Sequence, residues 1–334
     1  MDTERPPTLA DVARAARVAT STASRALQES SRISESTRLR VRAAAQDLGY
    51  RPNRIAQSLR TRSANIVGLV VPDIGAPFYS RVVKGAQSVF EQSGYAVLMM
   101  NTERRPDREK AAIHTLLEHR VRGVLVATSG GYTGDPEVPT VYFDNIIPNR
   151  GVGNVTRANG PGTALLVEHL REHGHDRIAY IGGPPVLTSG IQRLAGYRAA
   201  VRDLGLVDHD DYTQFSEMDW SPHSGAEAML RLLALEEPPT AVVTSGESLA
   251  LGALSACRTS GLRVPDDLAL VSFDDPPFGD LLDPPLTALS RNEEEMGRLA
   301  ASLLLHALQS TEPPAAAEVR LPLELVVRRS CGCQ

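Results

Sequence analysis

The sequence predicts an α/β protein whose body contains two doubly wound parallel sheets and whose N-terminal head is all-α. Residues 66–71 (IVGLVV) form a continuous apolar run, which is typical of a parallel strand covered on both faces. Short apolar runs then alternate with helical patterns, and this alternation restarts near residue 162. Such alternation specifies parallel sheets with helices on both sides. Before the first strand, the apolar spacing is helical instead.

The head begins with two short helices joined by a tight turn. The first helix has one apolar face, made of Leu9, Val12, Ala13 and Ala16, and the second runs over 20–27. The second helix of such a pair can lie in the DNA major groove and lead with its N-terminal side chains. Small hydroxyls reach base edges, and an arginine can bridge guanine O6 and N7. The candidate DNA contacts in this helix are Thr20, Ser21, Thr22, Ser24 and Arg25.

A third helix is expected over 36–48. Its apolar residues, which we expect to close a small core under the second helix, are Leu39, Val41, Ala45 and Leu48. A small helical bundle that has no DNA-binding role is the alternative interpretation of this pattern.

The distribution of charge along the chain favours the DNA-binding interpretation. Residues 1–62 contain twelve arginines, no lysine and six acids, a net charge of +6, whereas the whole chain carries −5, which leaves −11 for residues 63–334. A basic head on an acidic body is typical of nucleic-acid binding.

The body alternates strands and helices along its whole length. The expected elements are a helix over 79–92, a strand over 95–100, a helix over 107–119, strands over 124–127 and 140–143, a helix over 162–173, a strand over 178–181, helices over 192–204 and 224–235, a strand over 240–244, a helix over 248–259, a strand over 268–273, a helix over 293–308 and one terminal strand over 319–327. Two such lobes in tandem bury a cleft, where open α/β sheets bind ligands.

Several function classes find no support in the sequence. The N-terminus MDTERPP is no signal peptide and no apolar run approaches membrane-spanning length, so we expect a cytoplasmic protein. No nucleophile elbow, P-loop or dinucleotide-binding turn is present, so we expect no catalytic residues and no cofactor. Cys331 and Cys333 are expected to lie in a frayed tail, and His169 and His173, although spaced i, i+4, are not expected to bind metal.

The run LADVARAARVATSTASRAL, followed by GYRPNRIAQSL, resembles the headpiece of the lactose-repressor (LacI/GalR) family of bacterial transcription regulators. The resemblance implies a helix-turn-helix head over 1–51 and a hinge helix and linker over 52–62. The hinge forms when two subunits meet on the operator, and its leucine enters the minor groove and bends the duplex. The implied DNA contacts of this region are Tyr50, Asn53, Ala56 and, as the wedge, Leu59. Arg17 and Ala19 depart from the glycine and capping serine that are usual in the family.

The body carries further family fragments in the family's order, among them IVGLVVPD, GTALLVEHLREHGHDRIAYIGG, GLRVPDDLALVSFDD and LPLELVVRRS. It is similar to the type I periplasmic-binding-protein fold. The resemblance implies an effector-binding and dimerisation domain over 63–330, with an N-lobe over 63–158 and 291–318 and a C-lobe over 159–290 and 319–330. The chain would cross between lobes near 160, 290 and 320.

Candidate effector contacts follow the strand ends and the family's motifs. They are Asp73, Phe78, Tyr79, Arg193, Trp220, Glu247, Asp274 and Asp275. Carboxylates and a guanidinium can bind sugar hydroxyls, while the only tryptophan can cover the apolar face of a sugar ring. A flat nucleobase would also suit the aromatic residues. Alternative roles are lobe packing for Trp220 and loop capping or ion pairing for the charged residues.

These features predict a sequence-specific DNA-binding transcriptional regulator, a repressor in most members of the family. It would bind a palindromic operator in double-stranded DNA as a homodimer and respond allosterically to a small effector, a sugar or sugar derivative, in the cleft. A solute-binding component for transport is the rival interpretation. The basic head and the missing signal peptide argue against it.

Overall fold

The computed structural model describes residues 7–27, 33–50, 65–130, 137–183, 185–216, 220–290, 292–310 and 317–333. The chain forms two compact units, Met1–Ala64 and Asn65–Gln334, which we call the head and the body. No helix within the described residues combines the length and apolar character needed to cross a membrane.

Three helices form the described part of the head: α1 (Leu9–Ala15), α2 (Thr20–Leu27) and α3 (Glu35–Asp47). Helix α1 begins at a capping box, in which the Thr8 and Asp11 side chains each bind the other residue's backbone N–H. The core between the helices consists of small side chains, namely Val12, Ala13, Ala16, Ala23, Ala26, Val41 and Ala45. Small side chains let the three short helices approach closely around this core.

Two of the four residues expected on the core side of α3 lie elsewhere. Leu39 is 59% exposed and Leu48 is 40% exposed, whereas Val41 and Ala45 are buried as predicted. At 3.6 residues per turn, Leu39 lies about 200° around the helix from Val41, so both cannot face one core. Leu48 follows the last residue of α3. The predicted role of Leu39 and Leu48 in the core is therefore wrong.

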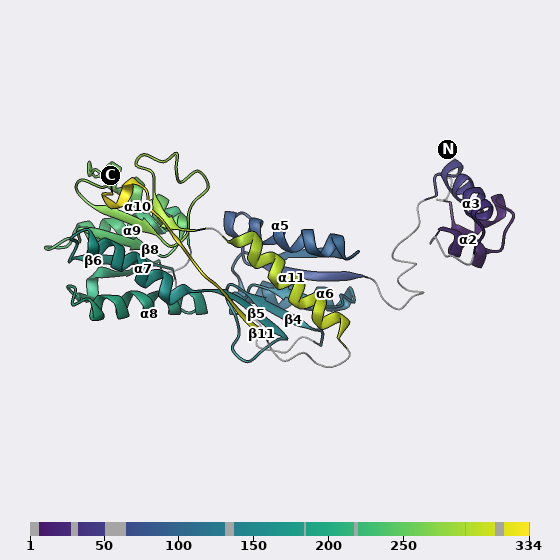
Figure 1. Cartoon of the computed structure of the whole chain (residues 1–334), viewed down its shortest axis with the longest axis horizontal. Helices are drawn as coiled ribbons and strands as arrows, with labels where there is room; N and C mark the ends of the chain where they lie inside the picture. Colours follow the sequence, from purple (N-terminus) through teal and green to yellow (C-terminus); the bar gives the residue numbers. More distant parts are fainter. Residues whose placement is uncertain are drawn as a thin grey trace. The chain divides into compact units, whose positions relative to one another are not determined.

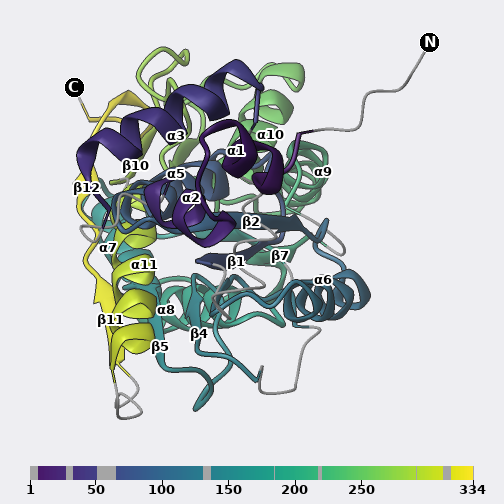
Figure 2. The ribbon, with the colours of Figure 1, turned by 90° about the vertical axis from the view of Figure 1, so that its right-hand side faces the viewer.

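The first sheet of the body contains β1 (Ile66–Val71), β2 (Ala96–Asn101), β3 (Val124–Val126), β4 (Thr140–Phe143), β5 (Gly153–Arg157) and β11 (Ala317–Leu321). Their order is β11-β5-β4-β3-β1-β2, and all neighbours are parallel. Helices α5 (Pro77–Gln92) and α11 (Glu293–Gln309) pack on one face, and α6 (Pro106–Glu118) packs on the other. Figure 2 shows α11 and α6 on opposite sides of these strands. We call this layered unit the N-lobe.

The second sheet contains β6 (Ile178–Gly182), β7 (Thr213–Phe215), β8 (Ala241–Thr244), β9 (Ala269–Ser272), β10 (Thr287–Leu289) and β12 (Leu325–Val326). Its order, β12-β10-β9-β8-β6-β7, repeats that of the first sheet, except that β12 is antiparallel to β10. Helices α7 (Asn159–Glu172) and α8 (Thr188–Asp203) cover one face, and α9 (Pro222–Leu233) and α10 (Glu247–Thr259) cover the other. This C-lobe lies beside the N-lobe in Figure 1. The predicted fold class is thus confirmed.

The chain passes between the lobes after β5, between β10 and α11, and between β11 and β12. The single terminal strand expected over 319–327 is wrong, because the chain leaves one sheet after Leu321 and joins the other at Leu325. Pro322, which has no backbone N–H for a sheet ladder, follows the first of these strands. Strands β5, β7 and β10 were not predicted, because they are short or, like GNVTR of β5, mostly polar.

Candidate functional site

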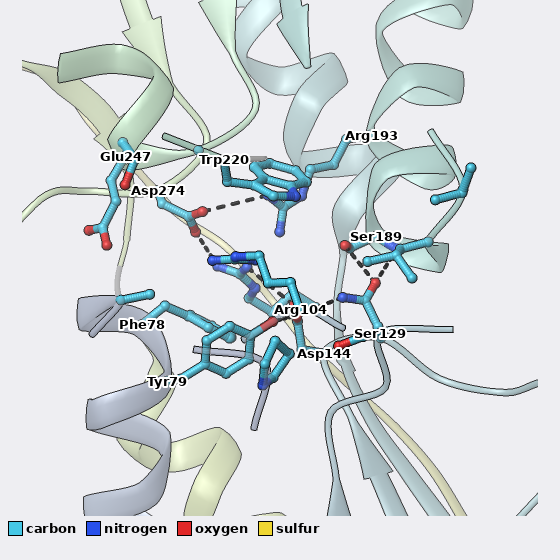
Figure 3. A pocket seen from close by; sticks show the side chains of 18 of the residues that line it. Phe78, Tyr79, Arg104, Ser129, Asp144, Ser189, Arg193, Trp220, Glu247 and Asp274 are labelled. Carbon is cyan, nitrogen blue, oxygen red and sulfur yellow. Dashed lines mark hydrogen bonds and ion pairs between the residues drawn. The ribbon is translucent and has the colours of Figure 1, made fainter. Parts of the chain in front are cut away.

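A cavity of about 310 Å³ lies between the two lobes, at the carboxyl ends of the parallel strands. Its lining residues are Pro72, Ala76, Phe78, Tyr79, Arg104, Pro106, Ser129, Asp144, Asn145 and Arg157 from the N-lobe, and Val186, Leu187, Ser189, Arg193, Trp220, Gly246, Glu247, Ser248 and Asp274 from the C-lobe. Figure 3 shows the side chains of both lobes converging on this space. The volume is at the lower end of the range for ligand pockets, which suits a small molecule.

Aromatic side chains enter the cavity from both lobes. Phe78 and Tyr79 lie in the first turn of α5, with their rings edge to face at 4.8 Å between centroids. Trp220 enters from the segment before α9 (Figure 3). A Cβ on Gly183 would lie 2.2 Å from Trp220 Cε2, so the indole can pack at the end of β6 only because that residue is glycine. Trp220 therefore packs against the C-lobe core and lines the cavity as well.

A chain of alternating charges runs from one lobe to the other beside the cavity. Asp144, after β4, lies 3.7 Å from the Arg157 guanidinium, which also binds Oδ1 of Asp274, after β9. The other oxygen of Asp274 lies 3.5 Å from Arg193 of α8. Phe78 and Phe273 rings lie against the Arg157 guanidinium, at 4.5 and 5.2 Å from centroid to Cζ. Four buried charges thus compensate one another across the lobe boundary.

Burial and pairing change the pKa values in this chain in different directions. Burial alone would raise the pKa of Asp274, but Arg157 and Arg193 outweigh it and hold that pKa below its usual 3.8. Burial lowers the pKa of Arg193, and the negative charge of Asp274 offsets this decrease only in part. Burial, together with the Asp144 charge, raises the pKa of Tyr79 well above 10, so its hydroxyl is protonated and donates to Asp144 Oδ2 at 2.9 Å.

Hydrogen bonds also join the lobes beside the charges. The Asn145 carbonyl oxygen accepts from the backbone N–H of Ser189 at 3.0 Å and from its hydroxyl at 2.7 Å. The Asn145 amide donates to Asp144 Oδ2 at 3.0 Å. Asn145 therefore connects the charge chain in the N-lobe to the first turn of α8 in the C-lobe.

Six of the eight predicted effector residues line the cavity: Phe78, Tyr79, Arg193, Trp220, Glu247 and Asp274. Asp73 and Asp275 do not. One oxygen of Asp73 accepts from the Gly75 N–H and the other lies 3.5 Å from Arg104. Asp275 binds both terminal nitrogens of Arg328, at 2.8 and 2.9 Å. A closer donor holds each of these two carboxylates away from the cavity wall, and contact of either residue with an effector stays a prediction.

Seven polar residues of the cavity wall were not predicted from the sequence: Arg104, Ser129, Asp144, Asn145, Arg157, Ser189 and Ser248. Asp144 and Asn145 directly follow the predicted strand over 140–143, so the rule of strand carboxyl ends would have found them. Arg157 ends β5, which was not predicted. Nothing in the local sequence indicates that it lies between two carboxylates.

The predicted DNA-reading helix presents part of its polar set to solvent. Thr20, Ser21 and Arg25 are exposed, while Thr22 and Ser24 are half-buried. Tyr50 packs against the head core. The remaining predicted contacts, Asn53, Ala56 and Leu59, lie outside the described residues.

The turn before this helix departs from ordinary backbone geometry. Arg17 has a φ of +52°, the left-handed region that glycine adopts freely. Ala19 precedes the first helical residue, Thr20, and its methyl group cannot cap α2.

Comparison with known proteins agrees with this division of the chain. Residues 8–53 match the family model of bacterial regulatory proteins of the lacI family, and residues 167–331 match that of the periplasmic binding protein-like domain. The HTH-type transcriptional repressor CytR of Escherichia coli (strain K12) is 32% identical, over 98% of this chain and 97% of its own length. The chain belongs to the LacI family. It is a transcriptional repressor with a helix-turn-helix DNA-binding domain and a ligand-binding domain.

Further relatives of the repressor agree with this assignment. The ribose operon repressor of Escherichia coli (strain K12) is 33% identical, over 92% of this chain and 94% of that protein. The structure of the lac repressor dimer bound to operator and the anti-inducer ONPF has a TM-score of 0.86 and 29% identity, covering 98% of this chain and 99% of that chain.

Proposed function

We propose that the repressor binds a palindromic operator as a homodimer and that a small sugar in the interlobe cavity controls this binding. The observation that carries the proposal is the cavity wall itself, in which buried charged groups of both lobes meet around a space of ligand size. A molecule that contacts such a wall interacts differently with each relative position of the lobes. That differential affinity is what shifts a conformational equilibrium.

Two polar atoms of the wall favour a ligand rich in hydroxyls. Ser129 Oγ and Arg157 Nε are buried and have no hydrogen-bond partner among the described residues. Buried polar atoms are nearly always satisfied in folded proteins, so a ligand or ordered water is expected at both. The charges of Arg157 and Arg193 are already compensated by Asp144 and Asp274. A neutral ligand with one apolar face beside Trp220 fits this wall best.

Coupling to DNA would follow from the links between the lobes. A ligand that strengthens or competes with the Asn145–Ser189 and Arg157–Asp274 contacts changes the angle between the lobes. In a dimer this moves the N-lobes of the two copies relative to each other, and the chain joins each DNA-binding head to the first strand of an N-lobe. A coupling free energy of about 1–3 kcal/mol would change operator affinity about 5–150-fold.

Exposed apolar side chains of the C-lobe support a second copy of this chain as the partner. Phe278 is 71% exposed and Leu281 is 75% exposed, in the loop after β9. Phe278 also has a φ of +62°, which is rare for a bulky residue. We expect Leu281→Asp to convert the dimer to a monomer in analytical ultracentrifugation. Val207→Asp, at another exposed apolar position, should leave it dimeric.

A thermal-shift screen of the full chain tests the choice of effector. A ligand that binds only the folded state raises the melting temperature, by an amount that grows with its concentration over Kd. Pentoses, hexoses and their derivatives are screened beside purine and pyrimidine bases. A shift with a sugar, lost in Arg193→Ala, supports the proposal. If only nucleobases raised the melting temperature, the effector would be a nucleobase and not a sugar.

Operator binding is tested by the salt dependence of affinity for a palindromic site, compared with a scrambled duplex. Contacts to phosphates release counterions, so affinity should fall steeply with rising salt. A protein that binds neither duplex at low salt would instead fit the solute-binding interpretation.

The hinge stays a prediction. Leu59→Ala should reduce the bending of operator DNA while the melting temperature of the protein is unchanged, and an unaltered bend angle would reject the leucine wedge.

A further inference from the structure

The C-terminus of the repressor returns to the end of α7, where two histidines lie one turn apart. His169 is buried in the last turn of α7, and His173 caps its end. The segment after β12 folds into a short 3-10 helix, Arg329–Cys331, in the lobe that contains α7 (Figure 1). Cys331 is fully buried there. The frayed tail expected for the two C-terminal cysteines is therefore wrong, because Cys331 packs in the C-lobe core.

This return brings three metal-binding side chains together and places a fourth, Cys331, next to one of them. Cys333 Sγ lies 2.8 Å from His173 Nε2 and 3.6 Å from His169 Nε2. The potential ligand atoms of these three residues all lie within 4.8 Å of one another. Cys331 Sγ is 3.2 Å from Cys333 Sγ. Zinc bonds of about 2.3 Å to sulfur and about 2.0–2.1 Å to nitrogen place tetrahedral ligand atoms roughly 3.3–3.8 Å apart. The Cys333–His169 separation lies in this range, and the Cys331–Cys333 separation lies just below it.

Neighbouring groups orient two of the four side chains for metal binding. The His169 backbone carbonyl, which can only accept, lies 2.7 Å from His173 Nδ1. The proton of His173 is therefore on Nδ1, and its Nε2 lone pair points to Cys333. On the other side, the Thr287 hydroxyl donates to Cys331 Sγ at 3.1 Å while accepting the Arg328 N–H. Hydrogen bonds of both kinds fix and tune metal ligands.

We propose that His169, His173, Cys331 and Cys333 form a tetrahedral Cys₂His₂ site for a divalent transition metal, with Zn²⁺ as the ion. Imidazole and thiolate ligands in this ratio select zinc over the hard cations magnesium and calcium, which prefer oxygen. Two thiolates and two imidazoles fill all four positions of a tetrahedral zinc site, so no position stays open for a metal-bound water that would meet a substrate. The site is thus structural rather than catalytic.

The metal site is separate from the effector cavity. Helix α7 begins at Asn159, which accepts a hydrogen bond from Arg193 in the cavity, and ends beside the cysteines. Its 14 residues separate the two ends by about 20 Å. The segment 317–333 pairs first with the N-lobe at β11 and then with the C-lobe at β12. Zinc would fasten the end of this interlobe segment to α7.

Cobalt(II) binding to the purified full chain tests the proposal, after chelation and under a phosphine reductant that keeps both thiols reduced. We expect one equivalent of Co²⁺ per chain, with thiolate-to-metal charge-transfer absorption and the intense visible bands of tetrahedral geometry. Added Zn²⁺ should displace the cobalt and bleach both signals. Zinc content measured by elemental mass spectrometry after gel filtration should also approach one per chain.

Variants separate a metal site from a chance cluster. Cys333→Ser and His173→Ala should each weaken Zn²⁺ affinity by about 100-fold or more, since loss of an outer-shell partner alone costs about 10–100-fold. Cys257→Ala and His223→Ala change a cysteine and a histidine on α10 and α9, outside the cluster, and should leave affinity unchanged. Zinc should raise the melting temperature of the wild type and of both controls but not of Cys333→Ser.

Two results would overturn the proposal. One is fully reduced protein that shows no thiolate-to-cobalt absorption. The other is equal Zn²⁺ affinity in wild type and Cys333→Ser, which would assign any bound metal to another place. Oxygen in air can oxidise the two thiols to a Cys331–Cys333 disulfide, which lowers the mass of the protein by two hydrogens. If this mass change is seen and the reduced protein takes up no metal, the two cysteines are a redox couple and not part of a zinc site.

Discussion

The head and the body place their functional side chains in opposite environments. In the head, Thr20, Ser21 and Arg25 are exposed to solvent, and the core of the head is made by other residues. In the body, the polar groups of the cavity are buried: Arg157 is 4% exposed and Arg193 is 3% exposed. Reading DNA and stabilising the fold are therefore separate tasks in the head. In the body, the residues that would bind an effector also form the contacts that hold the two lobes together.

This difference predicts where function and stability separate under mutation. A surface charge binds a polyanion at little cost in folding, because it stays hydrated until the partner arrives. A buried charge must be compensated within the protein before any ligand is present. Substitutions of the exposed residues of α2 should change DNA binding alone, whereas substitutions in the charge chain should change both ligand binding and stability.

The largest expected effect is on the stability of the body. Asp274→Asn leaves the Arg157 and Arg193 guanidinium groups buried without the carboxylate between them. Removing one partner of a buried ion pair costs about 3–5 kcal/mol, measured here as the free energy of unfolding in urea. Asp267→Asn, which removes an exposed carboxylate paired with Arg263, is the control and should change stability far less. Equal effects of the two variants would erase the contrast between buried and exposed charges.

The same carboxylate gives the body a pH dependence of known sign. The pKa of Asp274 is lower in the folded state than its usual 3.8, so the unfolded state binds its proton first as pH falls. Its contribution to stability is therefore fully present above about pH 5 and declines as pH drops through 3.8 and below. Urea unfolding of wild type should lose more stability across this window than that of Asp274→Asn. If the unfolding free energies of wild type and Asp274→Asn changed in parallel with pH, the pH dependence could not be assigned to Asp274.

The next largest effect is on operator affinity. Arg25→Ala should cost about 1–3 kcal/mol per half-site if the guanidinium binds a guanine edge, and should relax specificity at that base pair. The melting temperature and effector affinity should be unchanged, because Arg25 is exposed. Arg14→Ala, an exposed arginine of α1 outside the reading helix, is the matched control in an electrophoretic mobility assay. If Arg25→Ala kept the sequence specificity of the wild type, the base contact would have to be assigned to another residue.

A smaller effect separates binding from folding inside the body. Ser129→Ala removes a buried hydroxyl that has no partner within the described residues, so stability should be unchanged or slightly higher. Effector affinity in calorimetry should nevertheless fall by about 0.5–1.5 kcal/mol. Thr128→Val is the contrast, because the neighbouring hydroxyl donates to Glu109 at 2.7 Å and its loss should destabilise the fold. Destabilisation by both variants would mean that Ser129 serves the fold as well.

The smallest effect concerns the backbone of the head. Arg17→Gly should stabilise the head by about 0.5–1 kcal/mol, because glycine adopts a φ of +52° without strain. Arg17→Ala removes the same charge but keeps a Cβ, so the difference between the two variants isolates the backbone term. Hydrogen exchange of α1 and α2 amides in the full chain measures it. Equal protection in the two variants would show that the turn is not strained.

Much of the architecture could be predicted because it depends on local patterns. The apolar run over 66–71 became β1 with the same bounds, and the helix expected over 293–308 became α11. Strands escaped prediction where packing rather than pattern makes them. GNVTR of β5 is mostly polar but fully buried between β4 and β11, so its environment comes from its neighbours in the sheet.

The amino-acid sequence alone determined the order of elements, the charge difference between head and body, and which strand ends would face a cleft. Tertiary structure decided which polar side chains enter that cleft, because each carboxylate turns to its nearest donor: Asp73 to Gly75, Asp275 to Arg328 and Asp274 to Arg157. It also brought Cys333 to His173 across 160 residues of chain. Local spacing sets helices and strands, whereas the Asp275–Arg328 and Cys333–His173 contacts arise only when distant segments pack within the C-lobe, and the Asp274–Arg157 contact arises only when the two lobes meet.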